Sequence, residues 1–166
     1  MDKTILAALW RGRRPTLMIA LTAVLLALFA SVAYAATFEG TAGNDRFIGT
    51  PKGDRAVMKA GDDLARGLGE ADFLFGNADD DRLYGNDGSD LLNGGTDNDL
   101  LVGGTGEDEL VGSFGDDTIY TGTLTEGDKV PDEVQCGAGY DIVTLSGNDH
   151  ASHNTQAGKC EEINHY

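Results

Sequence analysis

Residues 85–120 read GNDGSDLLN, GGTDNDLLV, GGTGEDELV and GSFGDDTIY, four consecutive units of nine residues. Each unit opens on glycine, has aspartate at its sixth position and an apolar residue at its eighth. Outward from this stretch, aspartate keeps the same nine-residue period at Asp45, Asp54, Asp63, Asp72, Asp81, Asp90, Asp99, Asp108 and Asp117. Glycine opens every unit between 40 and 120 except the one that begins at Met58. A repeat this regular predicts that one small structural unit is stacked many times.

The residue chemistry of the unit favours strands and tight turns over helix. Glycine at each repeat, with Asn and Asp between, disfavours helix, and no apolar stripe follows a 3.6-residue period. Glycine also permits the left-handed backbone angles of tight turns. The eighth position holds one apolar or small residue that suits a short strand with one inward side chain. These residues are Phe47, Ala56, Ala65, Leu74, Leu83, Leu92, Leu101, Leu110 and Ile119.

The units from 40 to 120 resemble the nonapeptide G-G-x-G-x-D-x-U-x of the RTX family, the hemolysin-type calcium-binding repeats. The resemblance implies an all-β fold, a parallel β-roll. Such a roll is a right-handed β-solenoid with two nonapeptide repeats in each coil of 18 residues. It also implies that the first six residues of a unit form a turn and the last three a short strand.

In such a roll the aspartates of units two apart stack one strand spacing, about 4.8 Å, from each other. Two carboxylates at that distance repel by roughly 3.5 kcal/mol at an effective dielectric of 20. Ca²⁺ would neutralise them, since it prefers six or more oxygen ligands from carboxylates and carbonyls. Mg²⁺ demands stricter octahedral geometry, and the absence of His and Cys from residues 40–120 disfavours zinc. The sequence therefore predicts calcium ions between stacked turns.

We expect ions between Asp72 and Asp90, Asp81 and Asp99, Asp90 and Asp108, and Asp99 and Asp117. Pro51, Lys52 and Met58 depart from the repeat, which weakens the sites at Asp54 and Asp63, and Lys52 could partly replace a cation. The alternative is an acidic face that is only solvated. The full set of candidate ligand positions is Asp45, Asp63, Asp72, Asp81, Asp90, Asp99, Asp108 and Asp117 with Gly85, Gly88, Gly94, Gly103, Gly106, Gly112 and Gly115.

Metal binding is expected to be coupled to folding. The inward residues are few and small, while ordering the repeats costs conformational entropy along the whole stretch. Carboxylate repulsion opposes folding further. We therefore predict a largely disordered chain without calcium and a compact roll with it.

Residues after 120 are expected to form degenerate repeats and a C-terminal cap. After a short insertion at about 121–126, the register returns in GDKVPDEVQ at 127–135 and CGAGYDIVT at 136–144. The tail from Leu145 to Tyr166 loses the pattern, so it is expected to cover the last apolar layer. A disulfide between Cys136 and Cys160 would clamp this cap, and a free thiol pair is the alternative.

Residues 1–35 are predicted to be a secretory signal peptide. Basic residues from Lys3 to Arg14 precede an apolar run at about 17–30, and Ala33-Tyr34-Ala35 fits a cleavage site. An uncleaved membrane anchor is the alternative. The remaining chain has eight Lys or Arg and 27 Asp or Glu, a formal charge of −19. Such a charge disfavours nucleic acid and anionic membranes as partners and attracts cations.

The chain is not expected to be an enzyme, because it lacks His-Glu-x-x-His and Gly-x-Ser-x-Gly. His150 and His153 could form a second metal site, although solvated histidines are the simpler interpretation. The predicted function is that of a secreted, extracellular calcium-binding protein, with a roll at 36–120. Alternatives are a calcium-stiffened adhesin or extracellular matrix protein that binds a partner or polysaccharide, or an accessory to a secreted hydrolase.

Overall fold

The computed structural model describes residues 34–122, 130–146, 149–151 and 160–165. Every regular element within these ranges is a β-strand, and all strand pairs are parallel. None of these residues belongs to a helix that is long and apolar enough to cross a membrane. The predicted signal peptide falls almost wholly on residues 1–33, outside the described residues.

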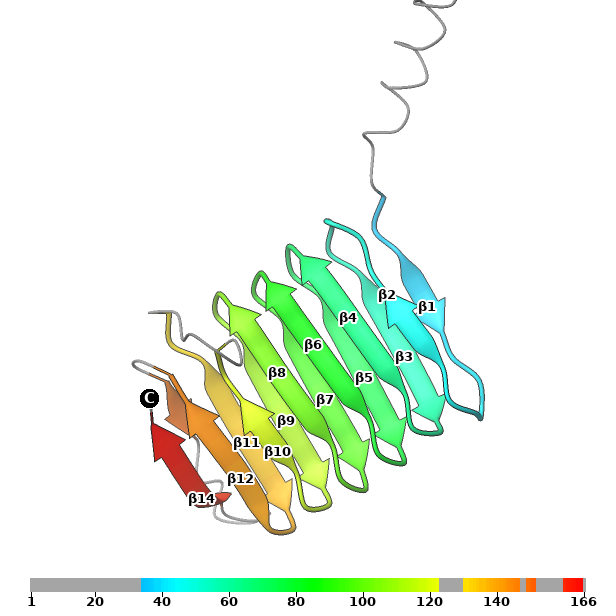
Figure 1. Cartoon of the computed structure of the whole chain (residues 1–166). Helices are drawn as coiled ribbons and strands as arrows, with labels where there is room; N and C mark the ends of the chain where they lie inside the picture. The colour runs from blue at the N-terminus through cyan, green and yellow to red at the C-terminus, as the bar shows by residue number, and fades with distance from the viewer. Residues whose placement is uncertain (1–33, 123–129, 147–148, 152–159, 166) are drawn as a thin grey trace, which may run out of the picture. The chain divides into compact units, whose positions relative to one another are not determined.

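The strands form two seven-stranded sheets, and the chain alternates between them (Figure 1). Sheet A contains β1 (Thr37–Glu39), β3 (Arg55–Ala60), β5 (Phe73–Ala78), β7 (Leu91–Thr96), β9 (Glu109–Phe114), β11 (Glu133–Ala138) and β13 (His150–Ala151). Sheet B contains β2 (Arg46–Ile48), β4 (Leu64–Gly69), β6 (Arg82–Asp87), β8 (Leu100–Thr105), β10 (Thr118–Tyr120), β12 (Asp141–Leu145) and β14 (Cys160–His165). The predicted all-β parallel β-roll is confirmed, as a solenoid of about 6 turns.

The register confirms that two units make one coil. Leu74 pairs with Leu92 in sheet A and Leu83 with Leu101 in sheet B, each 18 residues apart. After β9 and β10 the sequence separation of paired residues grows by six residues. Leu110 pairs with Val134 and Ile119 with Val143. The six additional residues therefore lie between β10 and β11, where the insertion near 121–126 was predicted, and both sheets continue beyond them.

The core is a column of inward side chains from the eighth position. Each of these residues from Ala56 to Ile119 is fully buried, and Phe47 is nearly so. Val134 and Val143 extend the column past the insertion. Met58 joins it, since its side chain is fully buried at a position where the other units have glycine.

The central strands are longer than the sequence predicted. Strand β7 runs from Leu91 through Thr96, so it includes the last three residues of one unit and the first three of the next. Only residues 97–99 separate it from β8. The expectation of a six-residue turn and a three-residue strand was wrong. Backbone hydrogen bonds between coils define these strands. Such bonds can form in glycine-rich segments, even though these segments lack the side chains that favour strands.

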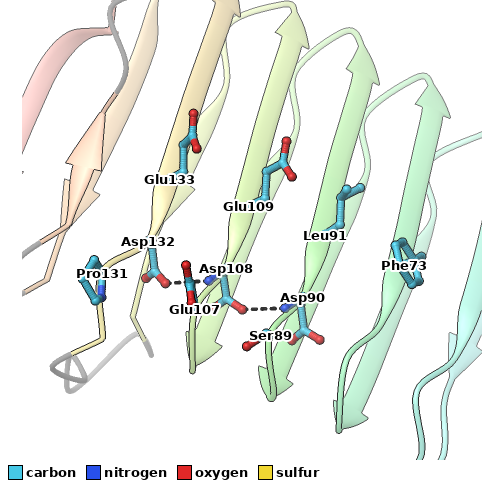
Figure 2. A pocket seen from close by; sticks show the side chains of 10 residues that line it. All are labelled: Phe73, Ser89, Asp90, Leu91, Glu107, Asp108, Glu109, Pro131, Asp132 and Glu133. Atoms are coloured by element: carbon cyan, nitrogen blue, oxygen red, sulfur yellow. Dashed lines mark hydrogen bonds between the residues drawn. The ribbon is translucent and has the colours of Figure 1, made fainter.

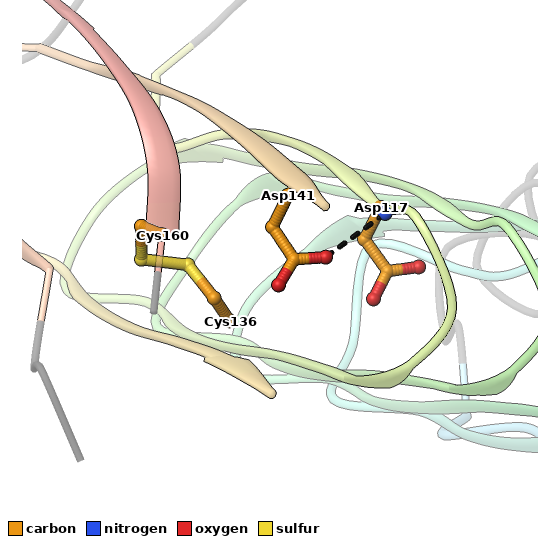
Figure 3. The surroundings of a disulfide bond; sticks show 4 residues. All are labelled: Asp117, Cys136, Asp141 and Cys160. Carbon is orange, nitrogen blue, oxygen red and sulfur yellow. Dashed lines mark hydrogen bonds between the residues drawn. A yellow bond between two sulfur atoms is a disulfide. The ribbon is translucent and has the colours of Figure 1, made fainter. Parts of the chain in front are cut away.

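The ends of the roll extend beyond the recognised repeats. Strand β1 already pairs with β3, and in the tail β13 pairs with β11 and β14 with β12. The tail therefore covers the last coil with strands that continue both sheets. The predicted disulfide is confirmed, with 5.5 Å between the Cα atoms of Cys136 and Cys160 (Figure 3). It ties β14 of sheet B to β11 of sheet A.

Candidate metal centre

The aspartates of the repeat form two files, one at each set of turns. File A precedes the strands of sheet A and contains Asp54, Asp72, Asp90, Asp108, Asp132 and Asp149. File B leads into the strands of sheet B and contains Asp45, Asp63, Asp81, Asp99, Asp117 and Asp141. Apart from Asp45, each of these side chains is buried, with at most 8% of its surface exposed. The aspartates thus point into the roll beside the apolar column.

Apart from that of Asp45, each carboxylate has one oxygen that accepts a hydrogen bond from a backbone N–H of the preceding coil. The backbone N–H of Asp72 donates to Oδ1 of Asp90 at 2.8 Å. In the same way the N–H of Asp90 donates to Oδ1 of Asp108 at 2.9 Å, as Figure 2 shows. File B repeats the pattern from Asp81 to Asp99 and from Asp99 to Asp117, at 2.8 and 2.9 Å. All four predicted aspartate pairs are therefore brought together. This geometry leaves their role as calcium ligands a prediction.

In six of these aspartates the second oxygen has no such partner. Oδ2 is buried and receives no hydrogen bond in Asp63, Asp72, Asp81, Asp90, Asp99 and Asp117. A buried carboxylate oxygen without a donor is costly, and native proteins rarely leave one so. A cation or a proton next to these oxygens would therefore stabilise the folded chain.

Burial also changes the proton affinity of these groups. It raises the pKa of Asp72 and Asp81 to about 7 and that of Asp99 to about 8, from an ordinary value of 3.8. Hydrogen bonds from the backbone partly oppose this rise in pKa, and neighbouring carboxylates such as Asp117 beside Asp99 add to it. The pKa of Asp90 and of Asp117 rises to about 6, again chiefly through burial. A cation at the files would favour the ionised form instead.

The glycine that opens each unit keeps room beside the second oxygen. A Cβ on Gly85 would lie 2.2 Å from Oδ2 of Asp90 and 2.7 Å from the carbonyl oxygen of Gly103. A Cβ on Gly76 would meet Oδ2 of Asp81 and the carbonyl of Gly94 in the same way. A carboxylate oxygen and a carbonyl oxygen of the next coil thus converge where a side chain would otherwise stand.

The other predicted glycines serve the repeat in two ways. Gly94, Gly103 and Gly112 lie against the carboxylates of Asp99, Asp108 and Asp117, as Gly85 does against Asp90. Gly88, Gly106 and Gly115 have φ angles of 140°, 121° and 128°, which side chains disfavour. The first three glycines therefore shape the space beside the carboxylates, and the last three shape the turns.

This donor set fits a hard, oxygen-preferring cation. Among the described residues, no group of three or more His, Cys, Asp or Glu side chains could hold a metal alone. An ion at the files would therefore use main-chain carbonyls together with carboxylates, which is the ligand chemistry of Ca²⁺. We call the space beside each opening glycine, where the Oδ2 atom and a carbonyl oxygen converge, a cradle. The Oδ2 atoms without hydrogen bonds and these cradles are consistent with such an ion.

Acidic grooves lie along both files. The groove over file A has a volume of about 590 Å³ and is lined by Asp90, Asp108 and Asp132 with exposed Glu107, Glu109 and Glu133 (Figure 2). A groove of about 440 Å³ lies over Asp81 and Asp99 of file B. These surfaces concentrate negative potential beside the buried carboxylates, which attracts cations.

The structure describes the surroundings of Lys52 and Met58, two departures from the repeat, while the expected weakening of the sites at Asp54 and Asp63 stays a prediction. Lys52 forms an ion pair with Glu70 on the neighbouring turn, and both side chains are about half exposed, so it does not take a cation's place at Asp54. Replacement of glycine by Met58 leaves Asp63 buried, with its Oδ2 lacking a hydrogen bond like those of the central aspartates. Asp63 is therefore placed like the central aspartates.

Sequence reasoning missed the hydroxyl groups beside the outermost aspartates. Thr41 and Thr50 donate to Asp45 and Asp54, and Thr121 and Ser146 donate to Asp149. For Thr41 and Thr50 the available signal was the second position of the unit. In the units between 40 and 120 it holds threonine in the first two and Gly, Asn, Ser, Lys or Leu in the others.

Comparison with known families gives one match. A family described as RTX calcium-binding nonapeptide repeat (4 copies) matches residues 33–54, 59–92 and 93–123. Neither the curated proteins nor the solved structures provide a match.

Proposed function

The chain belongs to the RTX calcium-binding nonapeptide-repeat family, and from that premise we propose that it is an extracellular protein whose roll folds around several calcium ions. The observation that carries the proposal is the set of buried Oδ2 atoms without hydrogen bonds in Asp63, Asp72, Asp81, Asp90, Asp99 and Asp117. Family membership supports calcium as the ion, and family members are typically extracellular. The proposed role is binding rather than catalysis.

The chain's own residues prepare the sites. The N–H of one coil holds Oδ1 of the next aspartate, so the carboxylate is fixed while Oδ2 faces the cradle beside the glycine. A bound calcium ion would supply the positive charge that these oxygens lack. Asp72, Asp81, Asp90, Asp99 and Asp117, with carbonyls of the opening glycines, are the groups that would hold it.

Folding follows from the same arrangement. Without a cation, bringing the coils together buries carboxylates that prefer water. The rise that burial causes in the pKa of Asp72, Asp81 and Asp99 supports such a cost. An ion that binds only the coiled state stabilises it by about 2.7 kcal/mol per site at a concentration 100 times the dissociation constant. Several sites in one column make this effect large. The proposed protein therefore folds where calcium is abundant.

Equilibrium dialysis against calcium tests the proposal, with two variants of one turn. Asp99→Asn removes a buried carboxylate charge, whereas Asp97→Asn removes an exposed one two residues earlier. The purified protein should bind several ions, Asp99→Asn should bind fewer, and Asp97→Asn should match the original protein. Absence of bound calcium in the unsubstituted protein would refute the proposed function.

One surface favours a second candidate function, the binding of an acidic polysaccharide. Arg46, Arg66 and Arg82 are exposed on the outer face of sheet B, on strands β2, β4 and β6. Across the described ranges, none of the three forms an ion pair, whereas Arg55 and Lys59 both pair with Glu39. The guanidinium of Arg66 also lies 5.2 Å from the ring centre of Tyr84. Unpaired arginines beside an aromatic ring suit a sugar polymer that carries carboxylates.

Co-sedimentation with an insoluble polyuronate tests this candidate. Arg46→Gln combined with Arg82→Gln should abolish binding, while Arg55→Gln, on the other sheet, should not. All these proteins should bind calcium equally. Unchanged sedimentation of the double variant would exclude the arginine face as the polysaccharide site.

A further inference from the structure

The aspartates at the N-terminal end of both files differ from those in the middle. Oδ2 of Asp45 accepts hydrogen bonds from the N–H and the hydroxyl of Thr41, at 2.6 and 3.0 Å. In Asp54, Oδ2 accepts from the N–H of Thr50, and Oδ1 accepts from its hydroxyl at 3.1 Å. Oδ1 of Asp54 also accepts from the N–H of Ala36. Asp45 therefore has protein donors at Oδ2 and Asp54 has them at both oxygens, whereas Oδ2 of Asp72, Asp81 and Asp90 has none.

The identity of the second residue in the unit explains the difference. At this position Lys59, Leu68, Asn77, Asn86 and Ser113 have φ between 78° and 94°, and Gly95 and Gly104 also have positive φ. A β-branched residue disfavours that region, and Thr41 and Thr50 do not occupy it. Strands β1 and β2 accordingly contain three residues rather than six. The threonine hydroxyl then caps the turn and reaches the carboxylate.

The C-terminal end of file A shows the same solution with other residues. Oδ2 of Asp149 accepts from the hydroxyl of Thr121, and from the N–H and hydroxyl of Ser146 at 2.8 and 2.9 Å. Its Oδ1 accepts from the N–H of Asp132 at 3.1 Å. Thr121 is fully buried and occupies the position where every preceding unit except the one at Met58 has glycine. Here a hydroxyl stands beside the carboxylate where the central coils offer a cradle.

We infer that Asp45, Asp54 and Asp149 bind no calcium, because hydroxyl and main-chain donors take the place of the ion, and that calcium is confined to the coils between them. This inference rests on the proposed function and separates the aspartates that bind calcium from those that do not. Thr41, Thr50, Thr121 and Ser146 are then the residues that set where calcium binding stops. A carboxylate already supplied with donors gains less from a cation than one whose buried oxygen has none.

Counting bound ions at saturating calcium tests the division, with folding of each variant checked by circular dichroism. Asp54→Asn and Asp45→Asn should bind as many ions as the unsubstituted protein, whereas Asp90→Asn and Asp81→Asn should each bind at least one fewer. A loss of ions in Asp54→Asn equal to that in Asp90→Asn would overturn the inference and leave the proposed function standing. Failure of the unsubstituted protein to bind calcium would overturn both.

A second variant covers the case in which Asp54→Asn does not fold. Thr50→Val has nearly the same shape and removes only the hydroxyl, while the N–H groups of Thr50 and Ala36 still donate to Asp54, so the ion count should not fall. If Thr50 and Asp54 together ligate a cation, the same variant binds fewer ions, and the inference is wrong. Asn86→Val provides no such comparison, because its backbone is left-handed, with φ of 78°. Thr41→Val is the appropriate repeat of the test at the other file.

Discussion

Replacement of Gly85 by alanine probes the space beside the carboxylate of Asp90. The added Cβ would lie 2.2 Å from Oδ2 of Asp90 and 2.7 Å from the carbonyl oxygen of Gly103. Gly85 does not have a positive φ, so alanine is compatible with its backbone. Gly43→Ala is the matched control, because a Cβ there meets no atom within 4 Å.

The size of the effect depends on how far the carboxylate of Asp90 and the carbonyl of Gly103 can move. The carboxylate oxygen would have to move by roughly 1.3 Å or more to reach an ordinary contact distance. Its Oδ1 is held by the N–H of Asp72 at 2.8 Å, and the carbonyl of Gly103 belongs to a paired strand. Overpacking of this kind costs about 1–3 kcal/mol. Expressed as affinity, that is a loss of about 5- to 150-fold in calcium binding at this level of the roll.

A calcium titration followed by circular dichroism measures the effect. Gly85→Ala should need more calcium to reach half-maximal strand signal, whereas Gly43→Ala should match the unsubstituted protein. Guanidinium unfolding in excess calcium should give the same order of stability. If the two variants have equal midpoints, the cradle is not where calcium binds, and the reasoning from glycine to ligand geometry fails.

Three further predictions concern protons, the disulfide and the core. In chelator, the free energy of unfolding should fall as pH rises from about 4 to 8. The reason is that Asp72, Asp81 and Asp99 have a pKa above 3.8 in the folded state, so their protonation stabilises the fold. Stability that instead rises with pH would contradict this. With calcium, affinity should weaken as pH falls through the same range, since protons compete with the ion. Reduction of Cys136–Cys160, whose sequence separation is 24, should lower the stability of the calcium-bound protein by about 3.5 kcal/mol, and an unchanged guanidinium midpoint would show that the bond is dispensable. Leu92→Ala, at a fully buried position, should cost about 2–5 kcal/mol, and Leu91→Ala on the outer face much less; equal losses would contradict the assigned core.

The sequence predicted the features that depend on period. Because units two apart must occupy equivalent places, the spacing of Asp90 and Asp108 was enough to predict that they stack, and their hydrogen bond confirms the stacking. The same reasoning placed the insertion near 121–126, which the six-residue change of register bears out. Two cysteines beyond the repeats in a chain expected to be exported were enough to predict the disulfide.

Features that depend on contact between coils were not predictable in this way. The side chains of Gly94, Gly95 and Thr96 do not indicate in the sequence that β7 continues through them. The strand is defined there by its pairing with neighbouring coils. Strand β14 likewise pairs with β12 without the repeat, through an irregular register at Asp141 and Ile142. The hydroxyl donors could have been suspected from Thr41 and Thr50, but only if the left-handed backbone of the second position had been known.

The most direct test of the central claim is the strand content of the metal-free protein at neutral pH. Circular dichroism should show that excess chelator removes the strand signal. Calcium should restore that signal cooperatively, and Asp99→Asn should need more of it than Asp97→Asn. A strand spectrum in chelator identical to that in calcium would show that the buried aspartates need no cation, and the account would be wrong.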